Sequence, residues 1–139
     1  MKTIHLQIPA DADYIDVVRI CLLGVATKLG FSFEEIEDLK VAASEACSNA
    51  VLHRMESGAD VIDIAFEPSE SALTVSVVNY GASFDHEAAR DSAAAIEGGD
   101  RSELRVGGLG LYLMEALMDK VEMSSGEGKT EVRLTKYRS

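Results

Sequence analysis

The spacing of apolar residues changes several times along the chain, and each change predicts a new element. Residues 3–8 alternate between apolar and polar side chains, which is typical of a strand with one buried face. After Pro9, apolar residues recur at spacings of three and four as far as residue 29, which predicts an amphipathic helix. Asp11 or Asp13 can cap its start, and Gly30 ends it.

A second helix is predicted from Ser32 to about Arg54. Ser32 followed three residues later by Glu35 forms a capping box, in which each side chain bonds the other residue's backbone N–H. Its core stripe is mostly small, which lets the helix lie close to a sheet: Ile36, Leu39, Ala43, Ala46 and Ala50. Glu45 and Asn49 fall beside this stripe, an unusual place for polar groups unless something polar lies there.

The second half of the chain reads mainly as hairpins. Alternating apolar residues predict strands over residues 62–67 and 73–79, and a further pair over 121–123 and 130–136. A helix is predicted to open at residues 107–110 and to carry Leu111, Leu113, Met114, Leu117 and Met118. Paired hairpins and segregated helices predict one α+β domain over residues 1–139. Its fold would be a two-layer α/β sandwich with a mostly antiparallel mixed sheet and helices on one face.

Charge and composition narrow the class of protein. The 139 residues carry 13 basic and 24 acidic side chains, a net charge of −11, which argues against direct contact with nucleic acid or an anionic membrane. No apolar stretch approaches the roughly 20 residues that span a bilayer. The N-terminus lacks a signal-sequence pattern, and Cys21 and Cys47 lack metal-binding or redox spacing. We therefore expect a cytoplasmic protein with two reduced thiols.

Four segments carry candidate chemistry: Glu45 with Asn49, residues 79–85, residues 107–110 and residues 128–130. A helix places Glu45 and Asn49 on one face, where a carboxylate and an amide can orient a hydroxyl and complete a metal-ion shell. Glycines at a helix start expose backbone N–H groups to an anion. The glycine segment matches neither a dinucleotide fingerprint nor a P-loop. Each segment alone also fits an ordinary solvated face, turn, loop or hairpin end.

Together and in this order, the segments resemble the ATP-binding domain of the GHKL superfamily, also called the Bergerat fold. Within it the chain is similar to the anti-sigma-factor serine-protein kinases of the RsbW/SpoIIAB type. The similar stretches are residues 37–51, 83–85, 107–119 and 134–137. The resemblance implies an ATP lid at about 85–107. It also implies that Glu45 and Asn49 should face the Gly108–Gly110 backbone across the site.

The resemblance also implies a role for individual residues. Glu45 would be the catalytic base or orienting group for the attacking hydroxyl, and Asn49 would bind Mg²⁺ and the nucleotide. Asn79 would meet the adenine amino group, Gly81 would let the backbone approach the base, and Thr130 would bond near the adenine. The phosphates would meet backbone N–H groups of Gly107, Gly108, Leu109, Gly110 and Leu111. Arg105 would reach the γ-phosphate, with Arg101 as an alternative.

One position departs from this family. Relatives usually carry Asp where this chain has Asn79, so an ionised acceptor for the adenine amino group is replaced by a neutral one. Charge-assisted hydrogen bonds are roughly twice as strong as neutral ones. We therefore expect weakened ATP affinity or a relaxed base preference.

The resemblance implies an anti-sigma factor that regulates transcription. It would bind a sigma factor, keep it from RNA polymerase and use MgATP to phosphorylate a serine of a STAS-type anti-sigma antagonist. A homodimer is expected, with the first strand and helix as the candidate surface. The alternative is a nucleotide-dependent binding module that sequesters its partner without transferring phosphate. A histidine-kinase relay is disfavoured, and His53 and His86 are expected to be structural or exposed.

Overall fold

The computed structural model describes residues 2–57, 60–80 and 106–139. Five strands, three α-helices and one 3-10 turn follow one another along these ranges: β1 (Ile4–Pro9), η1 (Ala12–Tyr14), α1 (Ile15–Lys28), α2 (Phe33–Ser57), β2 (Val61–Pro68), β3 (Ala72–Tyr80), α4 (Val106–Leu117), β4 (Lys120–Gly126) and β5 (Lys129–Tyr137). In this part of the chain, no helix is long and apolar enough to cross a membrane.

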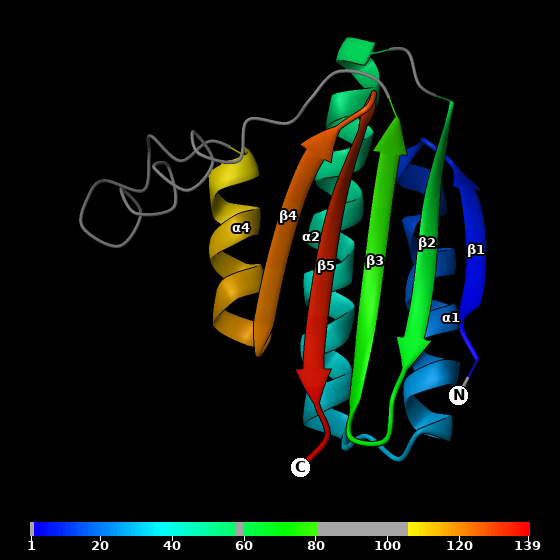
Figure 1. The fold of residues 1–139 in the computed structure, drawn as a ribbon, viewed down its shortest axis with the longest axis vertical. Coiled ribbons are helices and arrows are strands. Elements are labelled where there is room, and N and C mark those ends of the chain that lie inside the picture. Colours follow the sequence, from blue (N-terminus) through cyan, green and yellow to red (C-terminus); the bar gives the residue numbers. More distant parts are fainter. Residues whose placement is uncertain (1, 58–59, 81–105) are drawn as a thin grey trace.

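The five strands form one sheet in the order β1-β2-β3-β5-β4, and all four pairings are antiparallel. The helices lie together behind this sheet, with α2 between α1 and α4 (Figure 1). The predicted two-layer α+β sandwich is thus confirmed. The pairing of β3 with β5 has consequences for the site because it brings residues 79 and 130 opposite each other.

Local sequence signals set the helix boundaries. Asp11 caps the short η1 turn by accepting from the Asp13 N–H at 2.9 Å, and α1 follows from Ile15. Gly30 has a φ of 84°, the left-handed conformation that glycine adopts most easily, and it separates α1 from α2. The predicted capping box is present: the Ser32 N–H donates to Glu35 Oε1 at 2.7 Å, and the Glu35 N–H donates to Ser32 Oγ at 3.2 Å.

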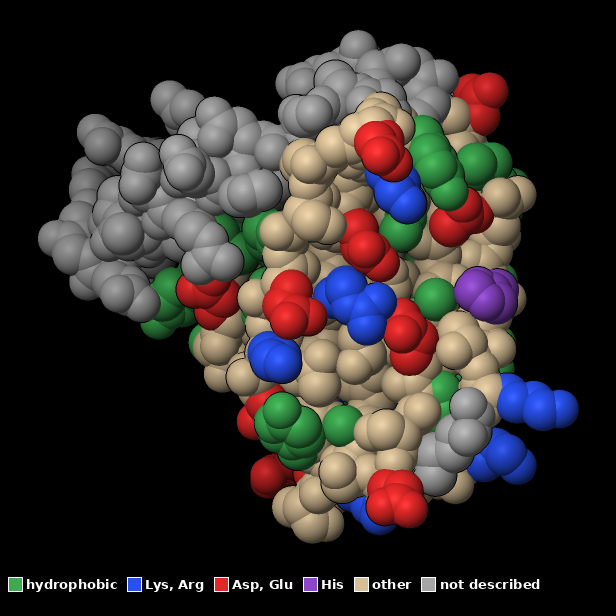
Figure 2. Space-filling view, in the orientation of Figure 1, with side chains coloured by type: hydrophobic (Ala, Val, Ile, Leu, Met, Phe, Trp, Pro, Cys, Tyr) green, Lys and Arg blue, Asp and Glu red, His purple; other side chains and the backbone are tan. Residues whose placement is uncertain are grey.

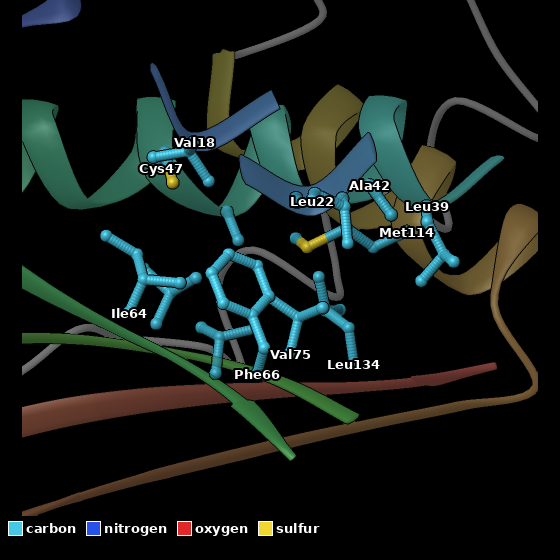
Figure 3. Close-up of a cluster of buried hydrophobic side chains, with 14 of the residues drawn as sticks. Val18, Leu22, Leu39, Ala42, Cys47, Ile64, Phe66, Val75, Met114 and Leu134 are labelled. Atoms are coloured by element: carbon cyan, nitrogen blue, oxygen red, sulfur yellow. The ribbon is translucent and has the colours of Figure 1, made fainter. Parts of the chain in front are cut away.

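The core lies between the helical layer and the sheet. Figure 3 shows Leu22, Leu39 and Met114 from the three helices meeting Phe66 and Leu134 from the sheet. These five side chains have no solvent exposure. The alanine stripe predicted on α2 is buried as well, which brings this helix close to the strands. Cys47 belongs to the same core, and burial raises the pKa of its thiol to about 12, so it stays protonated at neutral pH.

The end of the chain is tied to the first turns of α2. The backbone N–H of Ser139 donates to Glu35 Oε2 at 2.8 Å, and Lys136 Nζ donates to Asp38 Oδ2 at 3.1 Å. Lys136 also reaches the Leu117 carbonyl at the end of α4, at 2.7 Å. Backbone N–H donation from Ser32 and then Ser139 lowers the pKa of Glu35 to about 2. These contacts join α2, α4 and β5 at one end of the molecule.

The face of the sheet turned away from the helices is polar. Figure 2 shows acidic and basic side chains mixed across this face. Arg133 lies among them, donating to Glu67 Oε2 at 2.8 Å and lying 3.6 Å from a Glu131 oxygen. The predicted site residues Asn79 and Thr130 lie on the opposite face of the sheet, against α2, so the site is sought on the helical side.

Candidate nucleotide site

The predicted acid–amide pair lies on α2 against the start of α4. Glu45 and Asn49 are one turn apart, and both face Gly110 of α4. A Cβ built on Gly110 would lie 3.0 Å from Glu45 Oε2, 3.5 Å from Asn49 Nδ2 and 3.6 Å from Asn49 Oδ1. The structure therefore brings the two polar groups to the glycine segment that follows them by about sixty residues.

Gly110 permits this approach because it has no side chain. The separation of 3.0 Å is shorter than nearly all contacts that a real Cβ makes, so any larger residue would displace the Glu45 carboxylate. In a helix interior, glycine costs about 1 kcal/mol relative to alanine. Glycine therefore occupies the position where α4 contacts the acid–amide pair although it destabilises the helix. This is expected where the close approach of α4 to Glu45 and Asn49 is needed for function.

Burial changes the chemistry of both side chains. Glu45 is half-buried, and removal from water raises the pKa of its carboxyl group, which makes it a better proton acceptor near neutral pH than an exposed glutamate. Asn49 is only 5% exposed, and its Nδ2 has no hydrogen-bond partner in the described part of the chain. A buried polar group without a partner is costly, which indicates a site shaped for a polar ligand.

A second pair of polar side chains lies on the sheet below α2. Asn79 of β3 and Thr130 of β5 are opposite each other across the strand pairing and are 4% and 3% exposed. With Asn49 they line a narrow cleft, whose other walls are apolar: Ala46, Ala50, Val77 and Val132. The space in this cleft is about 10 Å³, room for about one water molecule, so a larger group enters only if its walls separate.

The glycine segment forms the start of α4, which begins at Val106. Gly107 and Gly108 lie in its first turn, where backbone N–H groups have no carbonyl partner within the helix. Gly110 and Leu111 lie in the second turn, whose N–H groups bond within the helix. In this conformation the backbone N–H groups available to an anion are therefore those of the first turn. Gly110 instead allows α4 to lie close to α2. Of the two leucines, Leu109 is 41% exposed and Leu111 is buried.

Some predicted site residues lie outside the described residues. They are Gly81, Arg101 and Arg105, together with nearly all of the expected lid at 85–107, including His86. The backbone of His53 belongs to α2, but its side chain is outside the description. Their roles stay predictions.

The donor set suits a magnesium ion bound together with phosphates. Mg²⁺ prefers oxygen ligands, keeps several waters and takes few protein groups when it binds a nucleotide. Asn49 offers a buried amide oxygen, and Glu45 offers a carboxylate beside it. Among the described residues there is no group of three or more His, Cys, Asp or Glu side chains that could hold a metal without other ligands. The assignment of the ion to Asn49 stays a prediction.

Sequence reasoning did not identify the apolar lining of the cleft. Ala46 and Ala50 were assigned to the core stripe of α2, and Val77 and Val132 to the buried faces of strands. All four are largely buried, so their pattern does not distinguish core from site. The one available signal was the presence of two small residues flanking the polar pair on α2.

Comparisons with known proteins identify the family of this chain. The family model described as a histidine kinase-like ATPase domain matches residues 8–136. The serine-protein kinase RsbW of Bacillus subtilis is 41% identical over 136 residues, covering 96% of this chain and 84% of the relative. RsbW of Halalkalibacterium halodurans is 38% identical over 137 residues, covering 98% of this chain and 83% of that protein.

Solved structures show the same fold. In the SiaB–SiaC complex of Pseudomonas aeruginosa, the matching chain has a TM-score of 0.72 at 17% identity, covering 95% of this chain and 88% of that one. The structure of the RsbU and RsbW domains of a Mycobacterium tuberculosis protein has a TM-score of 0.68 at 20% identity, covering 100% of this chain and 33% of the other. Sequence and fold together show that this chain belongs to the RsbW family of serine-protein kinases, built on a histidine kinase-like ATPase domain.

Proposed function

We propose that this protein transfers the γ-phosphoryl group of ATP to a serine hydroxyl of a partner protein. The observation that carries the proposal is the position of Glu45 and Asn49 against Gly110 at the start of α4. A carboxylate, an amide oxygen and a helix N-terminus converge there, which are the groups that phosphoryl transfer needs. The relatives named serine-protein kinase RsbW support the choice of serine as acceptor.

In this proposal Glu45 acts on the attacking hydroxyl. Its carboxylate accepts the serine proton as the serine oxygen forms a bond to the γ-phosphorus, and the bond from that phosphorus to the bridging oxygen breaks, releasing ADP. Half-burial raises the pKa of Glu45 and so favours proton acceptance. The first turn of α4 directs N–H groups at the phosphates, and the exclusion of water by the packed α2–α4 contact strengthens these interactions.

Asn49 would hold Mg²⁺ through its amide oxygen. When bound, the ion would neutralise part of the negative charge of the phosphates. Asn49 is buried, and its amide faces α4 at Gly110, where a Cβ would lie 3.6 Å from its Oδ1. Asn79 and Thr130 would bind the base in the cleft beneath α2.

The proposed partners follow from the family. The protein would bind a sigma factor and phosphorylate the antagonist that releases it, and it would act as a homodimer. A surface suited to dimerisation is present on α1, where Val17, Ile20 and Leu23 are 41%, 69% and 44% exposed. Such apolar side chains on one helix face are typical of a protein–protein contact. Sedimentation analysis of Ile20→Glu against the wild type tests this: the variant should become monomeric.

A second function, sequestration of a partner without phosphoryl transfer, is favoured by Asn79. A neutral amide in place of a carboxylate would hold ATP less tightly, and nucleotide occupancy would then only change the conformation of the protein. Both functions use the same site, but only the first requires Glu45 as a proton acceptor.

The deciding experiment incubates the protein with labelled ATP, Mg²⁺ and the STAS-type antagonist from the same cell. We expect label on a serine of the antagonist, with transfer lost in Glu45→Ala while nucleotide binding is retained. Glu37→Ala is the matched control, because Glu37 is a partly exposed glutamate of the same helix that pairs with Lys40 and not with α4. Absence of transfer by the wild-type protein, with nucleotide binding intact, would favour the sequestration function.

A further inference from the structure

The Asn79 side chain is buried in the cleft but incompletely bonded. It is 4% exposed, and its Nδ2 has no hydrogen-bond partner among the described residues. It lies one residue before the end of β3, where the strand leaves the sheet. A donor held in this way is available to a ligand that carries an acceptor.

The walls around Asn79 indicate which part of a nucleotide would meet it. Ala46, Ala50, Val77 and Val132 line the cleft with apolar surface, so once its walls separate the cleft suits a flat nucleobase better than a charged phosphate. The phosphates belong instead beside Glu45, Asn49 and the first turn of α4, where polar groups and free backbone N–H groups gather. Asn79 is therefore placed at the base end of the site.

An asparagine can recognise a base in two ways. Its Oδ1 accepts a hydrogen bond and its Nδ2 donates one, and rotation of the amide by half a turn exchanges them. Adenine presents a donor, the amino group at C6, whereas hypoxanthine and guanine present an acceptor, the C6 oxygen. An ionised carboxylate at this position would accept from the amino group but repel the oxygen.

We propose that this protein binds purine nucleotides with either an amino or an oxo group at C6, and that Asn79 is the residue that relaxes the choice. The inference rests on the proposed function only in requiring that a purine nucleotide occupies the cleft. It concerns the choice of nucleobase, which the Glu45–Asn49 pair on α2 does not determine.

The test is titration calorimetry with ADP and IDP in the presence of Mg²⁺. The two nucleotides differ at C6 and the adjacent ring nitrogen and share the ribose and phosphates, so their affinity ratio isolates the recognition of the base. For the wild type we expect affinities within about threefold of each other. For Asn79→Asp we expect the ADP:IDP affinity ratio to rise by about tenfold or more. A carboxylate can only accept a hydrogen bond, whereas the amide that it replaces can rotate and either accept or donate one.

Asn49→Asp is the matched control, because it makes the same chemical change on a residue assigned to the metal and phosphates. It should alter both affinities together and leave their ratio unchanged. If Asn79→Asp does not fold, Asn79→Ala replaces it, and ADP and IDP binding should weaken by similar factors.

Three results would overturn the inference, and they differ in their consequences for the proposed function. A wild-type protein that binds ADP at least tenfold more tightly than IDP refutes the relaxed choice but leaves the kinase proposal intact. A wild-type protein that binds neither ADP, IDP nor ATP refutes both. An unchanged ratio in Asn79→Asp would also show that residue 79 does not contact the C6 group.

Discussion

Replacing Gly110 with alanine separates the stability of α4 from the function of the site. Two effects of the added methyl group oppose each other. In a helix interior, alanine is better than glycine by about 1 kcal/mol, so α4 should become more stable. However, the new Cβ would lie 3.0 Å from Glu45 Oε2, closer than an ordinary contact between carbon and oxygen. The carboxylate must move because the backbone of the packed α2–α4 pair is harder to displace.

The size of this movement can be estimated from the contact. Restoring an ordinary separation requires Glu45 to shift by a few tenths of an ångström. Glu45 Oε2 is at the end of a flexible side chain, so the energetic cost is small and the net change in unfolding free energy should lie between 0 and about 1 kcal/mol of stabilisation. Displacement of a catalytic group by about 1 Å costs roughly 10²-fold in rate, so we expect transfer to slow by roughly fivefold.

The assay pairs urea unfolding with single-turnover phosphoryl transfer. Gly24→Ala is the control, because Gly24 also lies inside a helix but its added Cβ would meet nothing within 4 Å. Both variants should keep or gain stability, and only Gly110→Ala should lose transfer rate. Wild-type transfer by Gly110→Ala, or a loss of more than about 1 kcal/mol in its unfolding free energy, would refute the close-contact reasoning.

Three further predictions concern stability. Glu35→Gln should lower the unfolding free energy at pH 7 by about 1–2 kcal/mol, whereas exposed Glu34→Gln should not. The pKa of Glu35 is lowered in the folded state from 4.5 to about 2. Its contribution to the unfolding free energy is therefore complete above about pH 4.5 and is lost as pH falls toward 2. The difference in unfolding free energy between wild type and Glu35→Gln, measured in urea titrations, should shrink between pH 7 and pH 3. Phe66→Ala should cost roughly 3–5 kcal/mol by leaving a cavity in a fully buried position, and a midpoint shift near zero in the same titration would contradict the packing. Gly30→Ala should cost roughly 1–2 kcal/mol from backbone strain alone, since Arg138 Cδ lies 3.9 Å from the new Cβ, and Gly30→Asn should cost less in thermal unfolding.

Local sequence patterns predicted the parts of the fold that depend on neighbours in the chain. The capping box of Ser32 and Glu35 and the shared helix face of Glu45 and Asn49 both follow from spacings of three or four residues. The helices and hairpins, and hence the two-layer architecture, follow from the spacing of apolar residues. These features need no knowledge of tertiary contacts.

Features that depend on distant residues could not be obtained in this way. Asn79 meets Thr130 because β3 pairs with β5 and not with the next strand in the chain, a choice that no local pattern specifies. In the sequence analysis their placement together rested on resemblance to a family. The close contact of Gly110 with Glu45 depends on how α4 packs, and the bond from Ser139 to Glu35 joins residues 104 apart.

The bonds between the chain end and α2 have a consequence for how the cleft opens. The two elements that they join, α2 and β5, are also the elements that supply Asn49 and Thr130 to the cleft. Glu35 precedes Glu45 by ten residues, about 15 Å along the helix axis. These contacts therefore restrain the separation of α2 and β5 at the end of the molecule where α2 begins. Removing them would loosen the contact between the two elements without changing any side chain that lines the cleft.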